Sequence, residues 1–376
     1  MAGIYIHIPF CKQKCNYCDF YKEISLQHTD RFTEALITEL RSRVSYLNSA
    51  SVRTIYFGGG TPSVLTYDQF KGIFDCLYSC YLIDTDAEIT LEANPDDLNP
   101  EYLAMLQHLP FNRLSMGIQS FSDKELRAVN RRHTAQQAIQ AVGDARAAGF
   151  SNISIDLIYG LPGQTMEQWQ HNLQQAFELH PEHLSAYGLT YEEGTGLWKQ
   201  RARGKVVEVS DEVMLQMYRH MLLQMNDKGY EAYEISNFSK PGFRSQHNSS
   251  YWQLTPYLGA GPSAHSYDGV SRQWNVAHLI NYMEGLENSR PVFEREVLTP
   301  HDAYNDFVMV KLRTAEGIGL QEVEHRFGTS TKDRLLAQAT NYQLSGHVQI
   351  LEQYIRLTLD GIEISNTIIA DLMKTD

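Results

Sequence analysis

The sequence predicts an α/β fold, a partial parallel (β/α)6 barrel followed by a small α+β domain. Short aliphatic runs alternate six times with amphipathic helical segments over roughly the first two hundred residues. Such alternation requires crossover helices between parallel strands. Glycines, cysteines and acids follow the ends of several strands, where parallel barrels carry their active sites. An open doubly wound sheet is the structural alternative, and it would use the same strand ends.

Each expected strand is a short run bounded by turn residues. In the first run Ile4, Ile6 and Ile8 share one face, and Pro9 ends the strand. The expected strands are 4–8, 54–57, 87–93, 113–118, 152–159 and 183–189.

Between the strands, apolar residues recur at steps of three and four, as helices that bury one face require. Phe32, Leu36 and Leu40 show this spacing in the first helix, and Pro100 suits the first turn of the third. The expected helices are 28–47, 66–81, 100–109, 122–148 in one or two pieces, 165–179 and 211–228.

After the barrel, expected at 1–229, the composition changes. Residues 230–300 are rich in aromatic residues, Asn, Ser and Gly, and we expect a linker or extension there. Residues 301–376 predict a small winged-helix-like domain. Its expected elements are helices 302–312, 321–327, 331–341 and 361–373 and a hairpin of strands 348–351 and 354–359. This part holds 7 Lys and Arg against 11 Asp and Glu, a net charge of −4 that does not suit DNA, so we expect a lid or packing module.

The bulk composition excludes several classes of protein. A net charge of −13 argues against a nucleic-acid partner, which needs a basic face. No apolar run approaches a membrane span, and the N-terminus lacks the pattern of a secretory signal. Five cysteines, three of them crowded together, do not form a disulfide framework. We therefore expect a cytoplasmic protein that does not span a membrane.

Three cysteines, Cys11, Cys15 and Cys18, lie within eight residues, so their thiols must point at a common centre. A [4Fe-4S] cluster normally takes four thiolates, and two positions after Cys18 stands Phe20. The spacing therefore indicates a cluster with one iron open to another ligand. Zinc is the alternative, but structural zinc sites use four ligands, usually in separated pairs. Two more cysteines, at positions 76 and 80, are expected to be buried helix residues.

The cysteine spacing, with Tyr17 before the last cysteine, resembles the signature of the radical S-adenosylmethionine (SAM) superfamily. The stretch 58–62, Gly-Gly-Gly-Thr-Pro, resembles its SAM-amine-binding motif. Stretches 4–11, 114–121 and 155–165 resemble the oxygen-independent coproporphyrinogen III oxidase group, which includes the HemW-type heme chaperones.

The resemblance implies that SAM chelates the open iron and that its one-electron reduction yields methionine and a 5′-deoxyadenosyl radical. It implies no catalytic side chain. The SAM contacts that it implies are Tyr5, Tyr17, Gly59, Gly60, Thr61, Glu92, Gln119, Arg131 and Asp156. In that assignment the acids accept hydrogen bonds from the ribose or the SAM amine, and Arg131 pairs with the carboxylate of SAM. Without the resemblance, Glu92 and Asp156 would be surface or capping acids.

Two features favour the chaperone branch. The oxidases carry a further cysteine where this chain has Phe20, and 247–252, His-Asn-Ser-Ser-Tyr-Trp, resembles the HNxxYW motif of HemW proteins. A histidine is a natural axial ligand of heme iron, so His247 is a candidate heme ligand. The alternative is that His247 and Asn248 hold a loop by hydrogen bonds.

The resemblance therefore implies a chaperone that carries heme to respiratory hemoproteins at the membrane and uses an electron donor. The alternative is the oxidase itself, which decarboxylates propionate side chains to vinyl groups. A third possibility is a cluster that is only structural or redox-sensing, in which case SAM would not alter its spectrum.

Overall fold

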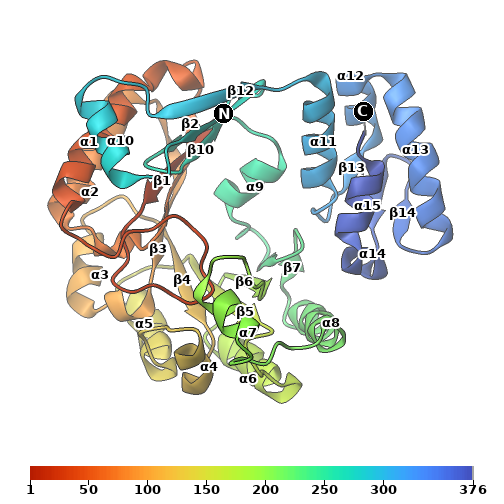
Figure 1. The fold of residues 1–376 in the computed structure, drawn as a ribbon, viewed down its shortest axis with the longest axis horizontal. Helices are drawn as coiled ribbons and strands as arrows, with labels where there is room; N and C mark the ends of the chain where they lie inside the picture. Colours follow the sequence, from red (N-terminus) through yellow and green to blue (C-terminus); the bar gives the residue numbers. More distant parts are fainter. Residues whose placement is uncertain (375–376) are drawn as a thin grey trace.

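The computed structural model describes residues 1–374, which form one large mixed sheet and one small sheet (Figure 1). In the described chain the large sheet has twelve strands in the order β12-β11-β10-β9-β1-β2-β3-β4-β5-β6-β8-β7. Strand β9 and strands β1 to β6 run parallel, and the outer strands at both ends are antiparallel. The expected parallel core is therefore present.

All six expected strands form. Their bounds are β1 Ala2–Ile8, β2 Val52–Gly59, β3 Ile83–Ala93, β4 Arg113–Gln119, β5 Ile153–Tyr159 and β6 His183–Gly188. The helices that pack on the outer face of the sheet are α1 Thr29–Ser42, α2 Tyr67–Cys80, α3 Pro100–Leu106, α4 Asp123–Ala128, α5 Ala135–Ala147, α6 Met166–Glu178 and α8 Asp211–Asp227. Three of them, α2, α5 and α6, begin with a capping box in which a threonine and a glutamine satisfy each other's backbone donors.

Some helix ends differ from the expectation. Helix α1 stops at Ser42 and continues as a 3₁₀ turn, Val44–Leu47, which ends at Asn48 in a left-handed conformation. The expected helix 122–148 is two helices, and Asn130, also left-handed, stands in the break. A short helix that the pattern did not predict, α7 Gly196–Ala202, packs beside the cysteine loop, where the Leu197 N–H donates to the Asn16 carbonyl.

Segment 230–300 builds both ends of the large sheet rather than only linking two domains. Its strands are β7 Glu231–Ala232, β8 Asn237–Ser239, β9 Tyr257–Ala260, β10 His265–Tyr267, β11 Ser271–Asn275 and β12 Phe293–Val297. It also forms α9 Gln246–Trp252 and α10 Leu279–Glu287. Helix α9 lies inside the curve of the sheet, facing β2 (Figure 1). Its position there matters for the site described below.

The buried carboxylate of Glu39 in α1 anchors this segment. It accepts hydrogen bonds from the Gly261 N–H at 2.8 Å, the Asn275 amide at 2.7 Å and the Tyr282 hydroxyl at 2.6 Å. Arg43, one turn later, supplies the countercharge at 3.3 Å. A buried acid is tolerated only with this many partners, so Glu39 fixes β9, β11 and α10 onto the barrel.

The C-terminal residues form a second, smaller core (Figure 1). Its elements are α11 Pro300–Lys311, β13 Ile318–Gly319, α12 Leu320–Phe327, α13 Thr329–Leu344, β14 Val348–Ile350, β15 Tyr354–Leu357, α14 Leu359–Glu363 and α15 Ser365–Leu372. The expected final helix, 361–373, is two short helices, α14 and α15. The expected hairpin forms as β14 and β15, and β13 adds a third strand to it. Within residues 1–374, no helix combines the length and the apolar character needed to cross a membrane.

Candidate functional site

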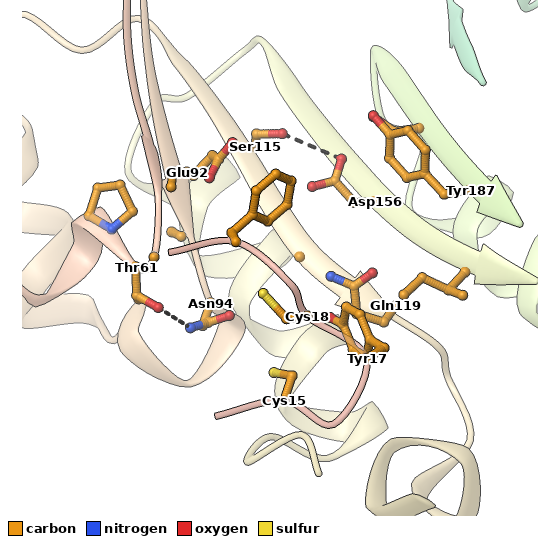
Figure 2. A pocket seen from close by; sticks show the side chains of 18 of the residues that line it. Cys15, Tyr17, Cys18, Thr61, Glu92, Asn94, Ser115, Gln119, Asp156 and Tyr187 are labelled. Carbon is orange, nitrogen blue, oxygen red and sulfur yellow. Dashed lines mark hydrogen bonds between the residues drawn. The ribbon is translucent and has the colours of Figure 1, made fainter. Parts of the chain in front are cut away.

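A cavity of about 600 Å³ opens at the carboxyl ends of the parallel strands and continues into the curve of the sheet. Figure 2 shows Cys15 and Cys18 on their loop, with Glu92 and Asp156 on the strands behind. Every site residue expected from the sequence lines this cavity. They are Tyr5, Cys11, Cys15, Tyr17, Cys18, Gly59, Gly60, Thr61, Glu92, Gln119, Arg131, Asp156 and His247.

Hydrogen bonds to its backbone hold the cysteine loop in place at its start and in its middle. The Cys11 N–H donates to the Glu23 carbonyl at 2.9 Å, and the Asn16 N–H donates to the Val129 carbonyl at 3.1 Å. The Asn130 amide reaches the Lys14 carbonyl at 2.7 Å. The loop is therefore fixed by the chain between α4 and α5, the same break in which Asn130 lies.

Two of the three thiols already receive hydrogen bonds. The Thr61 hydroxyl donates to Cys11 Sγ at 3.4 Å, and Arg131 Nη1 donates to Cys15 Sγ at 3.4 Å. Burial raises the pKa of Cys11, and the Thr61 hydrogen bond opposes that rise. Donors of this kind stabilise thiolate, the form that binds iron. The donor set therefore fits a cluster held by three cysteines, although no three His, Cys, Asp or Glu among residues 1–374 are grouped to hold a single metal ion.

The turn after β2 needs its glycines. Gly59 has a φ of +105°, and a Cβ there would lie 2.6 Å from the His7 ring. A Cβ on Gly60 would lie 2.7 Å from the Phe10 carbonyl oxygen, in the strand-to-loop connection that leads to Cys11. No side chain fits at either position, so the backbone of this turn can lie against the cysteine loop.

One carboxylate, that of Asp97, joins three of the motifs around the cavity. Its Oδ1 accepts from Lys12 Nζ at 2.7 Å and from Arg132 Nη2 at 3.0 Å, and its Oδ2 accepts from the Ser63 hydroxyl at 3.0 Å. Lys12 belongs to the cysteine loop, Ser63 follows the glycine turn, and Arg132 follows Arg131. The Asp97 side chain is 1% exposed, whereas Lys12 reaches it from the surface with 42% of its side chain exposed.

Asn94, three residues earlier, links two of the side chains that touch thiols. Its amide donates to Thr61 Oγ1 at 3.1 Å (Figure 2). Its carbonyl oxygen accepts from Arg131 Nη2 at 2.6 Å. Arg131 Nη2 also donates to the Gly117 carbonyl, while its Nε is buried without a partner. Residues 94–97 thus place both donors to the cysteine sulfurs.

Two acids point into the cavity from neighbouring parts of the sheet, Glu92 from β3 and Asp156 from β5, with Ser115 of β4 between them. Glu92 accepts from the Tyr56 hydroxyl at 2.7 Å and from the Gly59 N–H at 3.2 Å, and Asp156 accepts from the Ser115 hydroxyl at 3.5 Å. Burial raises the pKa of Glu92 to about 7, against the Tyr56 hydrogen bond, and the charge of Asp156 raises it further. Burial also raises the pKa of Asp156. Both acids keep acceptor capacity toward the cavity, so neither is a surface or capping acid.

Helix α9 forms the wall of the cavity opposite the cysteine loop. Both ring nitrogens of His247 have partners, since Nδ1 meets the Thr54 hydroxyl at 2.8 Å and Nε2 meets the Tyr251 hydroxyl at 2.9 Å. The ring is 2% exposed and stacks on Tyr56 at 5.0 Å. Burial lowers the pKa of His247 to about 3, so the ring is neutral at physiological pH.

The sequence of the whole chain places it in a known family. A profile of the Radical SAM superfamily matches residues 5–176, and a profile of the HemN C-terminal domain matches residues 298–364. The heme chaperone HemW of Mycobacterium tuberculosis is 34% identical over 350 residues, which cover 92% of this chain and 89% of the relative. The chain belongs to the HemW family of radical SAM proteins. The expected branch is thereby confirmed.

Other relatives and one solved structure agree with this placement. HemW of Bacillus subtilis is 33% identical over 371 residues, 98% of both chains, and HemW of Escherichia coli is 36% identical over 300 residues, 77% of this chain and 78% of the relative. Coproporphyrinogen III oxidase (HemN) of Escherichia coli, a radical SAM enzyme, shares 26% identity and a TM-score of 0.86 over 99% of this chain and 90% of its own. The expected fold class is confirmed.

Several residues that shape the cavity of this HemW-family chain were missing from the sequence prediction. They are Tyr56, Asn94, Asp97, Arg113 and Ser115. The period-two pattern of the strands places Tyr56, Arg113 and Ser115 on the inner face, but it does not separate them from ordinary interior polar residues. For Asn94 and Asp97 the signal was a Pro-Asp-Asp turn directly after a strand, which also fits a plain connection.

We expect Asp97→Asn to weaken retention of the iron–sulfur cluster. Loss of the carboxylate charge leaves Lys12 without an acidic partner and Arg132 with Asp96 alone, and we expect it to destabilise the fold by about 1–2 kcal/mol. Iron and sulfide content after anaerobic reconstitution and desalting measures the effect, and we expect at least a threefold drop. Asp86→Asn, at an exposed acid, is the matched control. Equal iron content in both variants would contradict the positioning role of Asp97.

We expect the stability of the cluster-free protein to fall as pH rises from about 5 to 7.5. The folded pKa of Glu92, about 7, lies above its ordinary value of 4.5, so the folded state holds a proton that the unfolded state has released. Denaturation curves should show Glu92→Gln gaining on the wild type by about 1–3 kcal/mol over this range. Glu101→Gln, at an exposed acid, should show no such change. A difference between wild type and Glu92→Gln that stays constant with pH would rule out this titration.

Proposed function

We propose that this protein is a heme chaperone that binds a [4Fe-4S] cluster and SAM and delivers heme to respiratory hemoproteins. The observation that carries the proposal is the convergence of three cysteines and two buried acids on one cavity, in a chain of the HemW family. The named function of the relatives supports the heme cargo, and the cavity supports the two cofactors.

Cys11, Cys15 and Cys18 hold the cluster in this proposal, with Thr61 and Arg131 donating to two of the sulfurs. Thr61 and Arg131 also belong to the SAM contacts that the sequence implies. The other SAM contacts are assigned to Tyr5, Tyr17, Gly59, Gly60, Glu92, Gln119 and Asp156. When bound, the cluster and SAM supply one-electron chemistry. Glu92 and Asp156 accept hydrogen bonds from ligand hydroxyl or ammonium groups, and the glycine turn lets backbone approach the ligand.

His247 anchors α9 in this proposal rather than binding the heme iron. Both of its ring nitrogens are occupied, and iron ligation would require the release of Tyr251 or Thr54. The backbone N–H groups of Gln246 and His247 donate to Glu88 at 3.1 Å and 3.0 Å, which fixes the start of the helix on β3. The HNxxYW motif would then act by shaping a wall of the cavity.

The alternative function is that of the oxidase, and the structural likeness to HemN supports it. Phe20, where the oxidases carry a cysteine, argues for the chaperone. It lies at the rim of the cavity and is 67% exposed. An electron donor would be needed in either case.

We expect the anaerobically reconstituted protein to bind one heme per chain and to leave coproporphyrinogen III unchanged. Optical heme titration measures the first, and chromatography after incubation with SAM and a reductant measures the second. SAM should shift the electron paramagnetic resonance (EPR) spectrum of the reduced cluster. Formation of protoporphyrinogen would establish the oxidase instead, and a spectrum that SAM does not move would overturn both assignments.

We expect His247→Ala to lower the free energy of unfolding by about 2–3 kcal/mol, because Thr54 and Tyr251 lose a buried partner. The Soret maximum of bound heme should stay in place, since the ligand is elsewhere. Tyr251→Phe, which removes only one of the two hydrogen bonds, is the matched variant. A Soret shift in His247→Ala but not in Tyr251→Phe would show that His247 binds the iron.

A further inference from the structure

The inner face of the parallel sheet is polar where barrels usually carry aliphatic layers. One layer of this face lies two residues before Glu92 and Asp156 along the strands, and we call it the floor of the cavity. It includes Thr90 on β3, Arg113 on β4 and His183 on β6, all buried. Arg113 is the first residue of β4, and its side chain reaches into the cavity with only 2% of its surface exposed. A cationic side chain therefore stands inside the sheet, below the two acids.

This guanidinium has no partner in the described chain. Among residues 1–374 it makes no side-chain hydrogen bond and no ion pair within 4 Å, and its Nε is buried and unsatisfied. A buried charge without a partner is strongly unfavourable, and arginine does not escape the cost by losing its proton. The site would therefore be stabilised by an anionic ligand that pairs with this guanidinium.

The groups around Arg113 do not supply that anion. His183 uses Nδ1 for the Ser154 hydroxyl and Nε2 for the Tyr233 hydroxyl, and Tyr233 also accepts from Asn248. Burial, and then the charge of Arg113, lowers the pKa of His183, so that ring is neutral. His183 and Tyr233 therefore bring no negative charge to the guanidinium. The nearby buried acid Glu88 uses its two carboxylate oxygens for the N–H groups that start α9 and forms no ion pair with Arg113 in the described chain.

The two acids above Arg113 act on it only through space. Its positive charge lowers the pKa of both Glu92 and Asp156, against the larger effect of burial, but neither carboxylate comes within ion-pair distance. Arg131 is a different case, because it is already bound to Cys15, Asn94 and the Gly117 carbonyl. Of the two arginines that line the cavity, only Arg113 has a guanidinium that makes no hydrogen bond within the described chain.

We propose that Arg113 binds a carboxylate of the tetrapyrrole, so that one propionate of the heme cargo reaches the floor of the cavity. The proposal rests on the proposed heme function. A planar guanidinium matches a planar carboxylate with two parallel hydrogen bonds, and a buried pair of this kind is stronger than an exposed one. The site thus selects tetrapyrroles that carry free propionates.

The experiment compares heme with heme dimethyl ester, whose propionates are blocked, on the reconstituted wild type, Arg113→Met, Arg113→Lys and Arg127→Met. The last variant removes an exposed cation of α4 and matches the change in net charge. We expect wild type and Arg127→Met to bind heme at least tenfold more tightly than the ester. Arg113→Met should bind both alike, and Arg113→Lys should keep part of the preference.

The outcomes separate this proposal from the heme function itself. If the wild type binds neither compound, the heme function fails. If it binds both equally, or if Arg113→Met keeps the preference, the carboxylate site is not at Arg113. If Arg113→Met instead loses SAM affinity tenfold, seen in the cluster's EPR spectrum, and keeps the preference for heme, the residue serves SAM and the proposal is overturned.

Discussion

The cavity depends on the carboxylate of Asp97. A parallel sheet brings its carboxyl ends to one edge, but it does not fix the loops that leave that edge. Asp97 receives Lys12, Ser63 and Arg132 at 2.7 to 3.0 Å, one from each of three loops. A carboxylate with three charged or polar donors and almost no exposure resists exchange with water. Asp97 thus ties the loops of the cysteines, the glycine turn and Arg131 to one another, in addition to the contacts that Asn94 and Asn130 make with them.

The cavity contains three buried ionisable groups whose burial costs stability. Glu92 and Asp156 are acids whose ionisation burial opposes, and Arg113 has no hydrogen-bond or ion-pair partner among residues 1–374. Each lowers the stability of the ligand-free protein, and each regains that energy when a complementary ligand binds. The outer face of the same sheet carries the apolar core that offsets the cost.

Much of this fold follows from local sequence. The six barrel strands are short periodic runs, and threonine–glutamine pairs mark the starts of three helices. The cysteine spacing and the glycine turn also located one end of the cavity. The strands of 230–300 were not predictable, because they are two to five residues long and their pairing partners lie far along the chain. Asp97 and Arg113 were missed since their importance lies in which side chains surround them, a property of the folded chain.

The position of α9 connects the family motif to the charge inside the sheet. Helix α9 lies in the curve of the sheet, where Glu88 holds its start and Thr54 holds the ring of His247. Asn248 and Tyr251 of the same helix line the cavity together with Arg113. A heme-binding role of the motif therefore does not require its histidine to reach iron. In the proposed function the helix would close the space that receives the carboxylate of the cargo, which would leave the cysteine end for the cluster and SAM.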